Sequence, residues 1–156
     1  MKNKFAVALF LLLLATAQIF CGEDMIVKID NYEITVPLGW LAQRTGALTV
    51  FLLYSPVEEN DDFHLTTEKL FSKYTVKGYL EASRKAVETV YGGFELLKEG
   101  ENYHIISGNV NGTVVQQIRF VEIKNNTAYI LTCTSNPANF DRYLETFKKI
   151  HKSFKY

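Results

Sequence analysis

The first regular pattern along the chain is an alternation of apolar and polar residues. It runs from Met25 to Asp30 and again from Tyr32 to Val36, and a period of two with β-branched side chains is typical of strands. The turn-forming stretch Pro37-Leu38-Gly39-Trp40 follows. Ala47 to Tyr54 is continuously apolar, which predicts a strand buried on both faces. A further strand is expected from His64 to Phe71.

An amphipathic helix is predicted to begin after Thr75, because its hydroxyl can cap the first turn. Gly92-Gly93 is expected to end this helix, and Gly78 weakens its first turn. The residues spaced to form its inward stripe are Val76, Tyr79, Leu80, Ser83, Ala86, Val87, Val90 and Tyr91.

A second helix is predicted to begin at Asn136-Pro137, since proline suits the first helical position. Lysines and His151 gather at its carboxyl end, where the helix dipole favours cations. Its inward stripe is expected to consist of Phe140, Tyr143, Leu144, Phe147, Ile150 and Phe154.

Between the two helices the pattern predicts a meander of four strands. Asn109 to Gly112 and Asn125-Asn126 supply tight turns, Asn-Gly being the strongest hairpin signal. Both faces of the last strand tolerate burial, which indicates that the sheet is covered on both sides. The predicted strands are Phe94 to Lys98, Asn102 to Gly108, Thr113 to Lys124 and Thr127 to Thr134.

The amino-terminal segment resembles a secretory leader. Lys2 and Lys4 precede an apolar run, and Ala15-Thr16-Ala17 provides small residues for cleavage. The run is shorter than the roughly 20 apolar residues of a membrane-spanning helix. We therefore predict a signal peptide over residues 1–17 and a single domain over residues 18–156.

Two cysteines leave alternatives open. Cys21 follows the apolar run, as an acylated cysteine would, but Phe20 before it fits a lipoprotein peptidase poorly. In an oxidising compartment Cys21 and Cys133 are also a candidate disulfide pair. The chain is thus expected to be periplasmic or secreted, and membrane-anchored only if Cys21 is lipidated.

Composition excludes several classes of protein. The chain has 156 residues, of which 47% are hydrophobic and 22% charged, as in one globular domain. Its 17 basic residues balance 17 acidic ones, so no nucleic-acid partner is expected. Two cysteines are too few for a disulfide framework.

Candidate chemistry is sparse. None of His64, His104 and His151 has zinc-ligand spacing to another ligand. The acidic stretch from Glu58 to Asp62, close to His64, offers oxygens for a hard cation but lacks the calcium-loop spacing, so a solvated turn is favoured. No cofactor or metal is expected.

Nucleophilic and surface motifs are equally weak. Cys133 lies mid-strand, where a thiol is usually inert, and Ser153 near His151 is a chance adjacency. Glycosylation sequons begin at Asn111 and Asn125, both explained by turns. Trp40, with Leu38 and Leu41 beside it, is either a binding ridge or a core plug, and the core is favoured.

Three segments carry a family resemblance. They are Tyr32 to Trp40, the helix after Thr75 with Tyr79-Leu80, and Ala128 to Thr134 followed by the last helix. Together they resemble the PsbP-like superfamily, including the DcrB-type exported proteins of bacteria, over residues 24–156. The resemblance implies an α+β fold, with an antiparallel sheet of about six strands and helices packed on both faces.

The resemblance also implies a role as an accessory protein rather than an enzyme. We expect an exported, non-enzymatic accessory or binding protein that docks on a protein partner in the cell envelope. The alternative is a periplasmic protein that binds a small ligand or a metal, in a pocket between sheet and helix or at the Glu58 to Asp62 turn. An exported hydrolase is disfavoured because no catalytic set is assembled.

Overall fold

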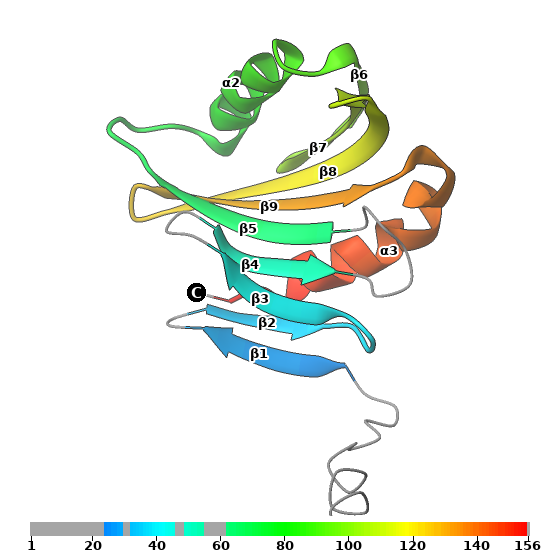
Figure 1. The fold of residues 1–156 in the computed structure, drawn as a ribbon. Coiled ribbons are helices and arrows are strands. Elements are labelled where there is room, and N and C mark those ends of the chain that lie inside the picture. Colours follow the sequence, from blue (N-terminus) through cyan, green and yellow to red (C-terminus); the bar gives the residue numbers. More distant parts are fainter. Residues whose placement is uncertain (1–23, 30–31, 46–48, 55–61, 156) are drawn as a thin grey trace, which may run out of the picture.

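A seven-stranded antiparallel sheet forms the centre of the molecule, with one helix on each face (Figure 1). The computed structural model describes residues 24–29, 32–45, 49–54 and 62–155. Its elements are β1 (Met25–Ile29), β2 (Tyr32–Val36), β3 (Leu41–Thr45), β4 (Thr49–Tyr54), β5 (Asp62–Lys69), α2 (Val76–Glu88), β6 (Gly92–Glu99), β7 (Tyr103–Val110), β8 (Thr113–Lys124), β9 (Thr127–Ser135) and α3 (Pro137–Ser153).

The strand order of the sheet is β3-β4-β5-β9-β8-β7-β6, and β1 and β2 pair separately as a hairpin. The predicted α+β class with helices on both faces is confirmed, and the sheet has one strand more than the six expected. The additional strand is β3, whose sequence LAQRT carries little apolar signal and which pairs only with β4 at the sheet edge. The leader, residues 1–17, lies outside the described residues.

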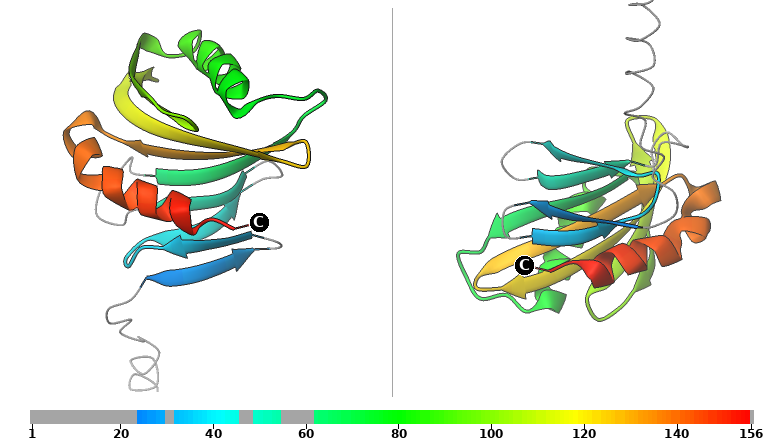
Figure 2. Two further views of the ribbon diagram at one scale, coloured as in Figure 1. Left: turned by 180° about the vertical axis from the view of Figure 1, so that it is seen from behind. Right: turned by 90° about the horizontal axis from the view of Figure 1, so that it is seen from below.

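Side chains alternate between the two faces of β9, as its sequence predicts. Leu131 and Cys133 belong to the larger core, whereas Ala128 and Ile130 belong to the smaller one. The larger core also contains Phe140, Phe147 and Ile150 from α3, and the smaller contains Leu80 from α2. Figure 2 shows the two helices on opposite sides of the sheet, so each core lies between the sheet and one helix.

Both helices begin where their capping residues predict. The backbone N–H of Gly78 donates to Thr75 Oγ1 at 3.1 Å, and that of Asn139 donates to Asn136 Oδ1 at 3.1 Å. These bonds satisfy N–H groups that have no partner within their own helix.

The end of α2 corrects the sequence prediction. The helix stops at Glu88, and Gly92-Gly93 begins β6 instead of terminating the helix. Thr89 Oγ1 donates to the carbonyl of Ala86 at 2.7 Å and closes the last turn early. Val90 therefore leaves the predicted inward stripe and is 73% exposed.

The β7–β8 and β8–β9 hairpins turn where expected. Asn111 and Gly112 have φ angles of 52° and 89°, and Asn125 and Asn126 have φ angles of 51° and 56°. Two consecutive residues with positive φ are typical of the type I′ turn, which matches the twist of paired strands. These turns set the registers of β7 with β8 and of β8 with β9.

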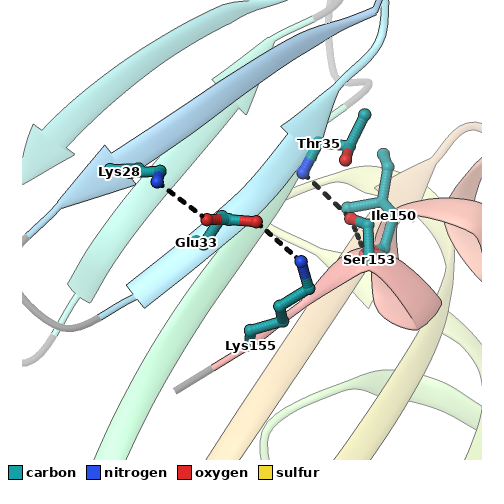
Figure 3. A network of polar contacts seen from close by, with 6 residues as sticks. All are labelled: Lys28, Glu33, Thr35, Ile150, Ser153 and Lys155. Atoms are coloured by element: carbon teal, nitrogen blue, oxygen red, sulfur yellow. Dashed lines mark hydrogen bonds and ion pairs between the residues drawn. The ribbon is translucent and has the colours of Figure 1, made fainter.

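The β1–β2 hairpin is attached to the end of α3 (Figure 3). The backbone N–H of Glu33 donates to the Lys155 carbonyl at 3.0 Å, and the reciprocal bond is 2.9 Å. The N–H of Thr35 donates to Ser153 Oγ at 2.9 Å. Glu33 also pairs with Lys28 and Lys155, and hydrogen bonds from these lysines, Lys155 first, hold the pKa of its carboxyl below the usual value. The two ends of the described chain are thereby joined.

Candidate binding pocket

A pocket of about 460 Å³ opens between α2 and the face of the sheet that α2 covers. Its floor comes from β5, β8 and β9, and its wall from α2. It continues along α2 into a smaller hollow of about 310 Å³ that shares Glu68, Tyr79 and Ser83. The larger pocket is lined by His64, Thr66, Thr67, Glu68, Lys69, Tyr79, Ser83, Arg119, Ile130 and Thr132.

A row of polar side chains crosses four strands on this face of the sheet, and three of its members, Arg119, Thr132 and His64, line the pocket. In the antiparallel registers, His104 on β7 lies opposite Arg119 on β8, Arg119 opposite Thr132 on β9, and Thr132 opposite His64 on β5. Residues directly opposite each other in paired strands project from the same face. The sheet thus presents this row to α2, where an apolar core would otherwise be expected.

A second polar group lies beside this row. Tyr91 donates its hydroxyl hydrogen to Gln117 Oε1 at 2.9 Å, and Gln117 Nε2 donates to Thr134 Oγ1 at 3.1 Å. Gln117 and Thr134 are opposite residues of β8 and β9 and are nearly buried. This chain of hydrogen bonds fixes the polar floor next to Arg119.

Arg119 is the central charged group of the pocket. Its Nη1 donates to Ser83 Oγ on α2 at 3.5 Å, while its Nε is buried and has no hydrogen-bond partner within the described residues. Burial lowers the pKa of this guanidinium, although Tyr91 and Tyr79 partly oppose the change. An arginine stays protonated in proteins, so the pocket holds a positive charge that is partly removed from water.

His104 lies beside Arg119 and is only 1% exposed. Both of its ring nitrogens are buried without a hydrogen-bond partner in the described part of the chain. Burial, with the positive charges of Arg119 and Arg84, lowers its pKa from 6.5 to about 4. The imidazole is therefore neutral at neutral pH, and it lies at the buried end of the polar row rather than among the residues that line the pocket.

Two partly exposed groups form the rim. Tyr79 donates its hydroxyl hydrogen to the carboxylate of Glu68, and burial together with this carboxylate raises the pKa of the phenol. Lys69 Nζ donates to the carbonyl of Asn125 at 3.4 Å. Glu68, the one carboxylate among the described residues that line the pocket, is thus hydrogen-bonded to the wall rather than to Arg119.

The other histidines have separate surroundings. His64 lines the pocket, with Nδ1 3.6 Å from the Asp62 carboxylate. His151 stacks on Phe120 at 4.1 Å on the opposite face of the sheet, and its Nε2 is 3.1 Å from Glu122. Within the described residues, no three metal-binding side chains come together. Residues 58–61 of the acidic turn lie outside them.

Cys133 and Trp40 both face the larger core. Cys133 is fully buried, and burial raises the pKa of its thiol well above the usual value. Cys21 lies outside the described residues, so its pairing or lipidation stays a prediction. The Trp40 ring meets Tyr143 and Phe147 edge-on, each at 6.3 Å, which confirms the core plug, whereas Leu38 is 54% exposed.

Ser153 holds the β1–β2 hairpin. Its hydroxyl donates to the Ile150 carbonyl at 2.7 Å and accepts from the Thr35 N–H. The imidazole of neighbouring His151 is hydrogen-bonded to Glu122 instead. The two residues thus take part in different structural contacts.

The sequence did not identify Arg119, His104 and Ser83 as members of one site. A signal was present in β8, where Gln117 and Arg119 occupy the same face as the buried Val115 and Val121. Two polar residues in an otherwise apolar series on one strand face are unusual for a core. The cross-strand register was needed to bring His104, Thr132 and His64 beside them.

Comparison with solved structures identifies the fold. The chain superimposes on the cyanobacterial PsbP (CyanoP) of Synechocystis sp. PCC 6803 with a TM-score of 0.53 and 13% identity, covering 85% of this chain and 91% of that one. It superimposes on the Ran-binding protein Mog1p of Saccharomyces cerevisiae with a TM-score of 0.59 and 8% identity, covering 85% of this chain and 95% of that one. It superimposes on a variant of Mog1 with a TM-score of 0.61 and 10% identity, covering 86% of this chain and 96% of that one.

These similarities show a Mog1/PsbP-like fold, as the resemblance in the sequence implied. No family model matches the sequence. No curated protein matches it either. Among the described helices, neither combines the length and the apolar character needed to cross a bilayer.

Proposed function

We propose that this protein is a non-catalytic binding protein that acts outside the cytoplasm and receives a polar group of its ligand or partner in the pocket under α2. The observation that carries the proposal is the polar floor of that pocket, with Arg119 at its centre. A protein seldom retains desolvated polar groups where apolar packing would be more stable, unless they serve recognition.

The size of the pocket suits a small molecule or a protruding side chain. Ligand pockets usually have volumes of about 300–1,000 Å³, and this one measures about 460 Å³. Of the two roles expected from the sequence, the geometry specifically supports ligand binding between sheet and helix. Docking on an envelope protein stays compatible with it, because a partner can insert one polar group there.

The fold and the leader support the remaining parts of the proposal. One protein of the same fold is a Ran-binding protein, which is a binding role. The Lys2-to-Ala17 leader pattern supports export. Ser83, which lines the pocket, is hydrogen-bonded to Arg119 rather than to a general base that could activate it as a nucleophile.

Filling the pocket tests this function. Ser83→Trp places an indole between α2 and the floor, and Lys85→Trp places the same group on an exposed position of the same helix. Each protein is incubated with an envelope extract of the source organism and examined by native mass spectrometry. We expect a bound species with the wild type and Lys85→Trp that is lost with Ser83→Trp.

Two outcomes would contradict the proposal. One is the absence of any bound species with the wild-type protein, and the other is undiminished binding by Ser83→Trp. Circular dichroism of both variants checks that neither indole has unfolded the domain.

A further inference from the structure

We infer that the pocket under α2 is an oxyanion site, which takes a carboxylate or phosphate group of a small ligand against the guanidinium of Arg119. This inference rests on the proposed function, because it names the chemistry of the group that the pocket receives. It is carried by the charges of the described residues around the pocket.

The first argument is an imbalance of charge. Arg119 lines the pocket, and no ion pair joins it to a carboxylate among the described residues. Arg84 on α2 adds a second positive charge near His104, and its Nε is also buried without a hydrogen-bond partner among the described residues. A buried charge without a counter-charge costs free energy. An anionic ligand would remove that cost.

The second argument is the free bonding capacity of the guanidinium. A guanidinium has five N–H donors in a planar fork that matches the two oxygens of a carboxylate or phosphate. Its described hydrogen-bond partners are neutral hydroxyl groups: Nη1 lies 3.5 Å from Ser83 Oγ, and the guanidinium also forms a side-chain hydrogen bond with Tyr91. The fork therefore retains donors for an incoming oxyanion.

The third argument is the nature of the surrounding groups. Ser83, Thr132 and His64 line the same pocket and can donate hydrogen bonds to further oxygens of an anion. Lys69 adds a positive charge at the rim. Glu68 would repel an anion, but its carboxylate accepts the hydroxyl hydrogen of Tyr79 at the wall.

An oxyanion titration followed by thermal unfolding tests the site. Sodium phosphate and sodium succinate are the probes, and sodium chloride at matched ionic strength is the reference. A ligand that binds only the folded state raises the unfolding temperature in a saturable way. We expect such a rise for the wild type with at least one probe, and the probe that is effective identifies phosphate or carboxylate as the preferred group.

Arginine variants connect the effect to the pocket. Arg119→Gln is expected to weaken the apparent affinity roughly tenfold or more, since a charge-assisted pair is lost. Arg142→Gln makes the same chemical change at an exposed position of α3, on the other face of the sheet, and should leave the affinity unchanged. Arg119→Lys keeps the charge but loses the fork, so an intermediate affinity is expected.

The stability of the unliganded variants gives a second measurement. If Arg119 is kept for binding, Arg119→Met should unfold at a temperature equal to or higher than the wild type without added anion, because an uncompensated charge has been removed. A clear fall would assign Arg119 a purely structural role and overturn the inference.

The inference would also be overturned if neither phosphate nor succinate raised the unfolding temperature more than chloride does. It would likewise be overturned if Arg119→Gln bound the effective probe with the apparent affinity of the wild type. The proposed function would survive these results if native mass spectrometry still found an uncharged ligand that Ser83→Trp excludes. The two proposals therefore fail by different observations.

Discussion

At the scale of single residues, the polar floor under α2 is the most unusual feature of the protein. His104 is buried beside Arg119 and Arg84, and its ring nitrogens have no partner among the described residues. Its neutral form is favoured because burial opposes a charge there and because both arginines would repel a third positive charge. The same surroundings make this histidine a source of pH-dependent stability.

Acid should therefore destabilise the protein through His104. Its pKa is about 4 in the folded state against 6.5 as the ordinary value. Below pH 6.5 the imidazole of His104 binds a proton in the unfolded chain but stays neutral in the folded chain until the pH reaches about 4. The free energy of unfolding therefore falls as the pH drops toward 4. The loss is up to about 3 kcal/mol. Urea unfolding between pH 7.5 and pH 4, in steps of about half a unit, measures it.

His104→Leu should flatten that pH dependence. It should not abolish it, because burial also lowers the pKa of His151, although Glu122 partly opposes the change. An unchanged slope in His104→Leu would show that His104 is not the group responsible.

At the scale of elements, the amino ends of the helices are determined by local chemistry. Asn136 and Pro137 define the start of α3, and Thr75 defines that of α2, as the sequence predicts. The carboxyl end of α2 was predicted a turn too late, because Val90 and Tyr91 continue the apolar spacing. Tyr91 instead packs on β7, where its Cβ lies 2.8 Å from an ideal Cβ placed on Gly108, so only glycine allows this approach.

The cap of α3 should have a measurable effect on stability. Asn136→Ala removes the side-chain acceptor for the Asn139 N–H, which keeps only the Asn136 carbonyl, and should lower the free energy of unfolding by about 1 kcal/mol. Asn136→Asp keeps an acceptor and should retain most of that stability. Equal losses in both variants, measured by urea unfolding, would mean that the amide group itself has another role.

At the scale of the whole molecule, the carboxyl end of the chain anchors its first described strands. The hairpin of β1 and β2 is outside the seven-stranded sheet, yet Ile34 and Val36 are fully buried in the larger core. The Glu33–Lys155 backbone pair and the Thr35–Ser153 bond hold it against α3. The hairpin thus depends on residues at the far end of the sequence (Figure 3).

Deleting residues 152–156 should loosen the hairpin selectively. We expect faster amide hydrogen exchange in Tyr32–Val36, with little change in Thr113–Lys124 and Thr127–Ser135, which pair with each other in the sheet. Lys155→Met serves as the control, because it removes the exposed ion pair but keeps the backbone bonds. Uniformly faster exchange would show that the hairpin belongs to the global unfolding unit.

The sequence alone determined the features that depend on neighbouring residues: the period-two strands, the caps at Thr75 and Asn136, the Asn-Gly and Asn-Asn turns, and the apolar stripes of α2 and α3. Tertiary structure alone decided the pairing of β3 at the edge, the anchoring of Glu33 to Lys155, and the row from His104 to His64. Local signals act through backbone conformation and helix or strand period, which a single segment contains. The row depends on hydrogen-bonded registers between strands far apart in the chain, so its chemistry appears only after the sheet has assembled.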